Sequence, residues 1–366
     1  MKNNLPVLFY DTNGFDELAQ FLDKQTYSKL FILVNQKTKR FCLPLFDKHN
    51  KHPYHRIEIK DGESHKNIKT VQYIWEQLTL LGADRQSILI NLGGGVITDI
   101  GGFAAATFKR GIRFINIPTT VLAMVDAAIG GKTGIDFQGL KNQVGVFQNA
   151  IALWINSAFL NTLDKRELAS GLAEILKYGF IETPALLEKL KNFQIDTQVL
   201  DINLIRESIS IKQKIVQLDP MEHGIRKTLN FGHTLGHAIE THYLSKSKKE
   251  QLLHGEAVAI GMIMALHLSH QLLGFDIEKL RIYSQLMLRF YTDMTGTTRY
   301  QLPLIDLDET SSIINLLQHD KKNNKGRINF ILLKDIGKPV IDCQVTHNQI
   351  IESINFYNNI HSNHLK

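Results

Sequence analysis

Ile88-Leu-Ile-Asn-Leu-Gly93-Gly-Gly95-Val-Ile-Thr-Asp99 is the stretch that decides the fold of the first half of this chain. Its apolar opening, Ile88 to Leu92, has the length and composition of a buried strand. The glycines lead into Gly101-Gly-Phe-Ala-Ala-Ala106, a small-residue pattern typical of a helix. A strand that passes through glycines into a helix leaves backbone N–H groups at the positive end of the helix dipole, where a pyrophosphate can approach. Because the spacing is not G-x-G-x-x-G, a tight turn that needs glycine only for its backbone angles is the alternative.

A second apolar run, Phe114 to Ile117, leads to Pro118-Thr119-Thr120. In open α/β sheets ligands bind at the carboxyl edge of the strands, so these hydroxyls are candidates for ligand binding. Two glycine-rich segments follow, which we expect to be loops that each carry a lysine: Asp126-Ala-Ala-Ile-Gly-Gly-Lys132-Thr-Gly134 and Gly139-Leu-Lys141-Asn142-Gln-Val-Gly145. Any one such lysine either clamps an anion or is simply solvated. With Arg110 close by, the three basic elements favour phosphate.

Imidazoles and a carboxylate gather in the second half of the chain. His233 and His237 lie four residues apart, so a helix would place them on one face, about 6 Å between Cβ atoms. His254 follows, and Glu174 lies upstream. Three nitrogen or oxygen ligands with an open fourth position are typical of a catalytic zinc. Fifteen histidines also produce such pairs by chance, and a helical histidine more often packs or faces water.

These motifs occur in the order seen in the 3-dehydroquinate synthase family, which the chain resembles from about Asp61 to Asp320-Lys321-Lys322. The resemblance rests on the run Gly93 to Asp99, Pro118 to Thr133, Lys141-Asn142, Glu174-Ile-Leu-Lys177, Leu229 to His237 and His254-Gly-Glu256. It implies a lyase of the shikimate pathway that depends on NAD and on one divalent metal, zinc or cobalt. Such an enzyme converts a seven-carbon keto-sugar acid phosphate to 3-dehydroquinate and phosphate.

The resemblance also implies roles for individual residues. The metal ligands correspond to Glu174, His233 and His254. The cofactor-binding positions correspond to Asp61, Gly62, Glu63, Ser64, His65, Lys66, Gly94, Gly95, Val96, Ile97, Thr98, Asp99, Thr119, Thr120, Asp126, Lys132, Lys141, Phe159, Leu160, Asn161 and Thr162. The substrate phosphate corresponds to Lys132, Asn142 and an Arg110 that reaches in from the neighbouring subunit of a homodimer. The carboxylate and hydroxyl end corresponds to Lys212, Arg226 and Asn230, and the pocket is completed by Lys177, His237 and Lys321 or Lys322.

Length and composition agree with a two-domain α/β enzyme. A chain of 366 residues with 43% hydrophobic residues suggests two domains with a core each. We expect a Rossmann-like parallel-sheet domain for NAD over residues 1–155, with a helix from Ile68 to Leu81. We expect a mainly α-helical metal- and substrate-binding domain over residues 156–366, in which helices cover Lys165 to Tyr178, Ile202 to Leu218 and Glu256 to Leu273.

The formal charge of +6 comes from scattered basic residues and fits a basic cleft for a small anionic substrate better than nucleic acid. The amino terminus lacks the apolar core of a signal peptide, and His267 and His270 interrupt the most apolar helix. We therefore expect a cytoplasmic protein with no membrane segment. The two cysteines, Cys42 and Cys343, imply no disulfide framework.

Three other functions compete with this interpretation. A metal-dependent polyol dehydrogenase shares the glycine-rich half and the histidine-bearing helices, but it has no need for so many basic residues around one substrate. Another sugar-phosphate cyclase would lack a substrate carboxylate, against which Arg226 and Asn230 argue. A nucleotide-binding regulator would have broken catalytic residues, and we find none broken.

Overall fold

The computed structural model describes residues 5–10, 14–138, 140–195, 197–292, 301–318 and 328–364. The chain divides into two compact units, Met1–Asp164 and Lys165–Lys366. The division falls after the short 3-10 turn η5 (Ser157–Thr162), which the sequence assigns to the second domain.

The first unit is built on a six-stranded parallel sheet in the order β1-β8-β5-β4-β2-β3. The strands are β1 (Val7–Tyr10), β2 (Leu30–Asn35), β3 (His55–Ile59), β4 (Ile88–Gly93), β5 (Arg113–Pro118) and β8 (Ala152–Ile155). Every residue of β4 is buried, as expected for a central strand of a parallel sheet that is covered on both faces. The parallel-sheet domain expected from the sequence is confirmed.

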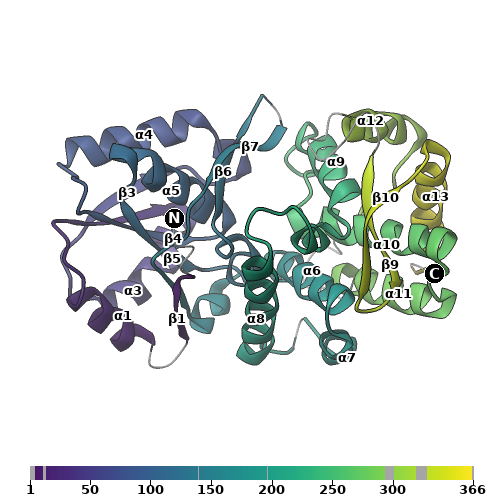
Figure 1. The fold of residues 1–366 in the computed structure, drawn as a ribbon, viewed down its shortest axis with the longest axis horizontal. Coiled ribbons are helices and arrows are strands. Elements are labelled where there is room, and N and C mark those ends of the chain that lie inside the picture. Colours follow the sequence, from purple (N-terminus) through teal and green to yellow (C-terminus); the bar gives the residue numbers. More distant parts are fainter. Residues whose placement is uncertain are drawn as a thin grey trace. The chain divides into compact units, whose positions relative to one another are not determined.

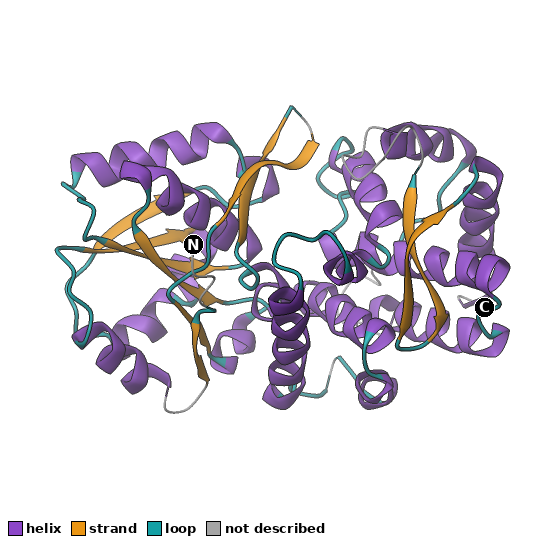
Figure 2. Ribbon diagram, in the orientation of Figure 1, coloured by secondary structure: helices purple, strands orange, loops and turns teal. Residues whose placement is uncertain are grey.

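Helices cover both faces of this sheet (Figures 1 and 2). They are α1 (Gly14–Asp23), α2 (Gln36–Phe41), α3 (Leu43–His49), α4 (Ile68–Leu80) and α5 (Gly95–Thr107). Helices α4 and α5 pack on one face around a core that includes Leu33, Leu89 and Ile100. On the other face, α1 lies against β1, β8 and α3. These two layers shield the apolar strands and leave their carboxyl ends to carry polar residues.

Gly130 and Gly131 lie in a bend, but Lys132 and Lys141, which were expected in loops, both lie on strands. These strands form an antiparallel hairpin, β6 (Lys132–Phe137) and β7 (Leu140–Phe147), in which Gly134 pairs with Gly145. A Cβ on Gly145 would lie 2.4 Å from the carbonyl oxygen of Thr133. Gly134 and Gly145 therefore allow the close approach of two strands, a reason that glycine content alone does not reveal.

The second unit is mainly helical, as expected (Figure 2). Its helices are α6 (Lys165–Ile181), α7 (Pro184–Lys191), α8 (Ile202–Leu218), α9 (His233–Leu244), α10 (His254–Leu273), α11 (Ile277–Thr292), α12 (Leu307–Gln318) and α13 (His347–His364). The central helix α10 packs against α6, α9, α11 and α13. By length and composition α10 could span a membrane, but 72% of its apolar window is buried within the folded chain, as in the core helix of a globular unit.

One hairpin in this unit was not predicted from the sequence. Strands β9 (Asn329–Asp335) and β10 (Lys338–Gln344) pair antiparallel, and β9 packs on α10. Lys321 and Lys322, between which the sequence does not choose, lie outside the described residues.

Candidate active site

Most of the expected cofactor residues follow the carboxyl ends of the parallel strands. Asp61 to Lys66 follow β3, Gly94 to Asp99 follow β4, Thr119 and Thr120 follow β5, and η5 with Phe159 to Thr162 follows β8. In register, Gly93 lies opposite Pro118, and the Thr119 N–H donates to the Gly93 carbonyl at 3.1 Å. The structure therefore brings these motifs to one edge of the sheet, where α/β proteins bind nucleotides.

Glycine at position 94 keeps this edge open. A Cβ there would lie 3.1 Å from Thr120 Cγ2, so a larger side chain would crowd the start of α5. Asp126 lies close by in a π-helical segment, Ala123–Ala127, that packs against α5. Single π-helical turns are rare in proteins, but those that occur are often found at functional sites. The position of Asp126 in such a turn agrees with the role at the cofactor that the sequence suggests.

Lys66 joins the sheet edge to the hairpin. Its Nζ lies 2.6 Å from Asp99 Oδ2 and donates to Asn142 Oδ1 at 2.7 Å, while Lys141 Nζ lies 2.9 Å from Glu63 Oε1. Burial by itself lowers the pKa of Lys66, but the carboxylates of Asp99 and Glu63 outweigh it and hold that pKa above its usual value. Lys66 is therefore charged, and it fixes the hairpin near the start of α5.

Lys132 and Asn142, both expected at the phosphate, lie at different levels of the hairpin. Lys132 pairs with Phe147 at its base, whereas Asn142 lies toward the turn, with a left-handed φ of 50°. The Asn142 N–H donates to Asp136 Oδ1 at 2.8 Å. The described structure thus holds Asn142 in a fixed, strained conformation and leaves Lys132 several residues away along β6.

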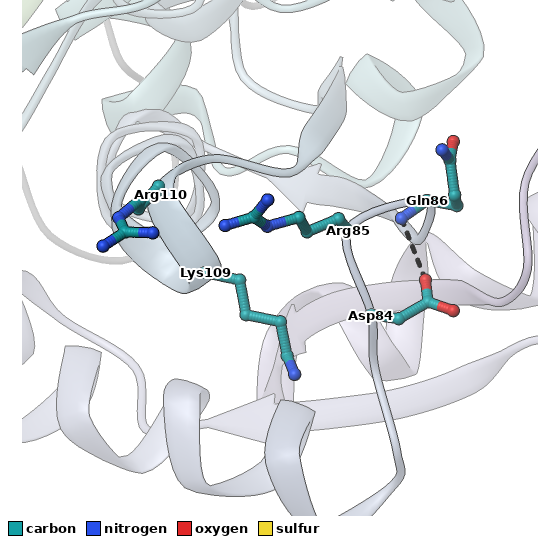
Figure 3. Close-up of a pocket in the computed structure, with 5 residues that line it drawn as sticks. All are labelled: Asp84, Arg85, Gln86, Lys109 and Arg110. Carbon is teal, nitrogen blue, oxygen red and sulfur yellow. Dashed lines mark hydrogen bonds between the residues drawn. The ribbon is translucent and has the colours of Figure 1, made fainter.

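Arg110 lies at the opposite edge of the sheet from Thr119. It belongs to the turn η3 (Phe108–Arg110) before β5, and it lines an open pocket with Lys109 and the segment Asp84 to Gln86 that precedes β4 (Figure 3). In Figure 3 the side chain of Arg85 extends toward Arg110. Since β5 has six residues at about 3.3 Å each, roughly 20 Å separates the two edges. Arg110 is therefore remote from the ligand edge of the sheet in its own chain.

The cationic side chains of this pocket outnumber its carboxylates by three to one. Within the described chain, no ion pair with a carboxylate is recorded for Arg85, Lys109 or Arg110. The one carboxylate of the pocket, Asp84, accepts hydrogen bonds from Ser28, Ser87 and the Gln86 N–H. Lys109 and Arg110 have φ values of 50° and 69°, a left-handed conformation that costs L-residues about 1–2 kcal/mol each. Such strain is found where a side chain must be presented for function.

Three histidines of the second unit converge on one point. His233 is the first residue of α9, His237 lies one turn later, and His254 opens α10. One nitrogen from each imidazole lies within 4.8 Å of the others, a spacing that suits a shared metal ion. Helix α9 begins after Gly232, whose φ is 77° and where a Cβ would lie 2.4 Å from Met262 Cγ. Glycine at this position therefore lets α9 approach α10 closely enough to join the histidines.

Glu174 completes the cluster from α6. Its Oε1 lies 3.4 Å from His233 Nε2 and 3.5 Å from His254 Nε2, and its Oε2 forms an ion pair with Lys177. The side chain is fully buried. Burial raises the pKa of a carboxyl, but Lys177 and His233 outweigh it and hold the pKa of Glu174 well below its usual range. The nitrogen distances exceed ordinary N–H···O bonds, so Oε1 suits coordination of a cation.

One more carboxylate contacts this cluster, on the side of the His254 ring that faces away from Glu174. No sequence motif pointed to it. Glu240, on α9 and 3% exposed, places Oε2 at 3.1 Å from His254 Nδ1. His233 Nδ1 contacts the Phe231 carbonyl at 3.1 Å. Both rings therefore direct Nε2 toward Glu174. Glu240 lies seven residues after His233, so its helical spacing was the signal that could have revealed it.

The residues expected at the carboxylate end of the substrate lie on neighbouring elements. Lys212 is buried on α8, and the 3-10 turn η6 (Ile225–Asn230), which packs on α8, carries Arg226 and Asn230. Arg226 NH1 donates to the Pro220 carbonyl at 2.7 Å. Asn230 Nδ2 donates to Glu222 Oε1 at 2.7 Å.

The loop before η6 is ordered by Asp219, a residue that the motifs did not reveal. Its carboxylate accepts the backbone N–H groups of His223, Gly224 and Arg226 at 3.0, 2.7 and 3.1 Å. These bonds hold the pKa of Asp219 below its usual value against the opposing effect of burial. Asp219 thus fixes the backbone from which Arg226 projects.

The polar residues at the carboxyl edge of the sheet form one cluster, and Glu174 with the three histidines forms another. Together with the fold, they define a class of enzyme that combines a nucleotide-binding parallel sheet with a helical, histidine-rich unit. Models of the 3-dehydroquinate synthase N-terminal and C-terminal families match residues 56–170 and 171–323. A 3-dehydroquinate synthase from Parabacteroides distasonis is 45% identical over 93% of this chain and 94% of its own length. The chain belongs to the 3-dehydroquinate synthase family.

Solved structures of related cyclases share the fold. The structure of ValA, a 2-epi-5-epi-valiolone synthase from Streptomyces hygroscopicus with NAD+ and Zn2+ bound, matches with a TM-score of 0.86 and 25% identity over 98% of both chains. A 2-deoxy-scyllo-inosose synthase complexed with carbaglucose-6-phosphate, NAD+ and Co2+ matches with a TM-score of 0.79 and 23% identity over 95% of this chain and 96% of that one. The family models favour 3-dehydroquinate synthase over the rival functions.

Proposed function

We propose that this chain converts 3-deoxy-D-arabino-heptulosonate 7-phosphate to 3-dehydroquinate and phosphate with NAD and one zinc or cobalt ion. Its family membership supports the reaction. The observation that supports this mechanism most directly is the convergence of Glu174, His233 and His254 on one point. Oε1 of this buried carboxylate faces two imidazole nitrogens at 3.4 and 3.5 Å, longer than ordinary hydrogen bonds, and a cation held between them explains this arrangement.

The described residues fit both cofactors. Glu174, His233 and His254 offer one oxygen and two nitrogens, a set that suits zinc or cobalt and leaves room for substrate oxygens. NAD fits the carboxyl edge of the sheet, where the α5 amino terminus supplies N–H groups and Gly94 leaves space beside Thr120. When bound, the metal polarises substrate oxygens, and NAD accepts a hydride and later returns it.

The basic residues would bind the two charged ends of the substrate. Lys132 and Asn142 would hold the phosphoryl oxygens as charge grows on them during elimination, an interaction that counts most when it is preorganised. Lys212, Arg226 and Asn230 would hold the carboxylate and hydroxyls.

The remaining residues of the pocket would move protons and balance charge. His237, 5.2 Å from His233 between ring centroids, would carry a proton on its imidazole or order a water near the leaving phosphate. Lys177 would balance the charge of Glu174. Lys321 remains a candidate for the pocket, and it lies outside the described residues.

The active form in this proposal is a homodimer. Arg110 lies one strand length away from Thr119, and with Arg85 and Lys109 it forms a cationic surface. Among the described residues these three side chains form no ion pair, and Asp84 is the one carboxylate of the pocket. A second copy that presents its bound phosphate to this surface would supply the missing negative charge. We also propose a cytoplasmic location. The burial of the apolar helix α10 within the folded chain supports its role as a core helix and not as a membrane span.

The test is to incubate the purified protein with NAD, zinc and the keto-sugar acid phosphate while phosphate and NADH are followed together. We expect phosphate to be released in step with substrate loss, with no net accumulation of NADH, because the hydride is returned. A sample stripped of metal and a sample without NAD serve as controls. Steady growth of NADH in proportion to substrate would establish a dehydrogenase instead.

A substrate analogue without the carboxylate separates this activity from that of other sugar-phosphate cyclases. We expect it to be a poor substrate for the wild-type protein, because Arg226 and Asn230 then lack their partner. Equal turnover of both compounds would favour another cyclase.

A further inference from the structure

Glu240 contacts the side of the His254 ring that faces away from Glu174. The imidazole has its Nε2 at 3.5 Å from Glu174 Oε1 and its Nδ1 at 3.1 Å from Glu240 Oε2. Both carboxylates are almost completely buried. With Nδ1 occupied as a donor to Glu240, Nε2 is the nitrogen left with a lone pair for a ligand role.

The two metal-facing histidines are held differently. His233 Nδ1 donates to a neutral carbonyl, that of Phe231, whereas His254 Nδ1 faces the charged carboxylate of Glu240. A carboxylate behind a histidine makes the ring a stronger donor to a metal and adds negative charge close to the cation. The carboxylate behind His254 should therefore affect the binding of a metal more strongly than the carbonyl behind His233.

The backbone that carries His254 is also fixed. Glu256, fully buried, accepts two hydrogen bonds from Arg166 at 2.6 and 2.8 Å and one from the Leu253 N–H at 2.7 Å. The Gly255 N–H donates to Ser170 Oγ at 2.9 Å, and a Cβ on Gly255 would lie 1.9 Å from the Ser170 carbonyl oxygen. Because the start of α10 is locked onto α6, the backbone of His254 is already fixed, and the contact with Glu240 acts on the orientation of its ring.

We propose that Glu240 is a positioning residue of the metal site, which acts through His254 and never touches the metal or the substrate. This inference rests on the metal site of the proposed function. Removal of the carboxylate lets the ring rotate or change tautomer and removes one negative charge near the cation. The expected loss is about 10- to 100-fold in metal affinity, the usual effect of such outer contacts.

The experiment measures the dissociation constants of Zn2+ and Co2+ by competition with a chromophoric chelator, on the full-length protein stripped of metal. The variants are Glu240→Gln, which keeps a hydrogen-bond acceptor but no charge, and Glu240→Ala, which keeps neither. We expect the affinity to fall in the order wild type, Glu240→Gln, Glu240→Ala. The visible spectrum of bound Co2+ should change with it, because that spectrum depends on the geometry of the ligands.

Glu309→Gln is the matched control. Glu309 is a carboxylate that faces another imidazole of α9, with His242 Nε2 at 3.4 Å from Glu309 Oε1, and it belongs to none of the proposed metal contacts. Its substitution should leave the metal affinity unchanged. NAD binding and circular dichroism report folding in every variant, and if Glu240→Ala fails them, Glu240→Gln decides the result.

Two results overturn the inference: wild-type metal affinity in the folded Glu240 variants, or an equal loss in Glu309→Gln. A failure of the proposed function is distinguishable, because the wild-type protein itself would then bind NAD but no metal.

Discussion

At the scale of single residues, Glu174 shows how strongly the site depends on charge balance. A carboxylate in a helix interior with no exposed surface loses its hydration, and it stays ionised only because cationic groups surround it. Lys177 supplies one positive charge, and the two imidazole nitrogens lie at 3.4 and 3.5 Å. A divalent cation bound between Oε1 and these two nitrogens would stabilise the ionised carboxylate further.

We expect Glu174→Gln to remove bound metal and turnover while the protein stays folded, because the amide is a weak ligand of nearly the same size. Elemental analysis and the phosphate assay measure these two effects, and circular dichroism checks the fold. Glu182→Gln, just beyond the end of the same helix and paired with Lys214 on the surface, is the control and should behave as the wild type. Metal near one ion per chain in the purified Glu174→Gln protein would contradict the ligand assignment.

At the scale of elements, the packing of α10 explains why its two histidines do not prevent burial. His267 stacks on Phe356 of α13 with ring centroids 4.5 Å apart, and His270 Nδ1 contacts the Phe275 carbonyl at 2.7 Å where α10 ends. Burial and the neighbouring His270 lower the pKa of His267. Its charged form is therefore disfavoured in the folded state.

The lowered pKa of His267 predicts sensitivity to acid. Because the unfolded chain binds this proton more readily, the contribution of His267 to stability is present above pH 6.5, its ordinary pKa, and is lost as the pH falls below it. We expect His267→Phe, which keeps the stacking but cannot ionise, to reduce the fall in unfolding free energy as the pH drops below 6.5.

Urea unfolding at a series of pH values measures this effect. His347→Gln, at an exposed histidine at the start of α13, is the control. Identical pH dependence in His267→Phe and the wild type would refute the assignment.

At the scale of the whole molecule, the proposed homodimer follows from the position of Arg110 at the edge of the sheet opposite Thr119. If Arg110 acts on the phosphate bound by a second copy, Arg110→Ala and His233→Ala are each inactive alone. Subunit exchange between them makes about half the dimers hybrid, each with one intact site, and should restore roughly a quarter of wild-type activity.

Mass spectrometry confirms subunit exchange in this experiment, and each variant incubated alone is the control. An inactive mixture with proven exchange would place Arg110 outside the chemistry of a shared site.

Much of the candidate site could be predicted from the sequence because its signals are local. The strand–glycine–helix pattern from Ile88 to Asp99 defines an element pair by composition and period. The spacing of His233 and His237 places both on one helical face, which the structure confirms as α9. The helix Ile202–Leu218 has the bounds expected from the sequence. In each case a few neighbouring residues contain the whole reason for the structure.

Tertiary structure alone decided which distant residues meet. Glu240 joins His254 only because α9 and α10 pack closely: its spacing from His233 places it on the same face of α9 but does not encode the contact with α10. Lys132 and Lys141 were expected in loops, but they lie on a hairpin that depends on strand pairing. Arg110 is separated from Thr119 by the length of β5. These contacts arise from long-range packing, whereas the helical period and the glycine turns arise from the local backbone. The sequence by itself therefore determined many of the elements and the chemistry of their side chains. Only the tertiary structure decided which of these side chains meet.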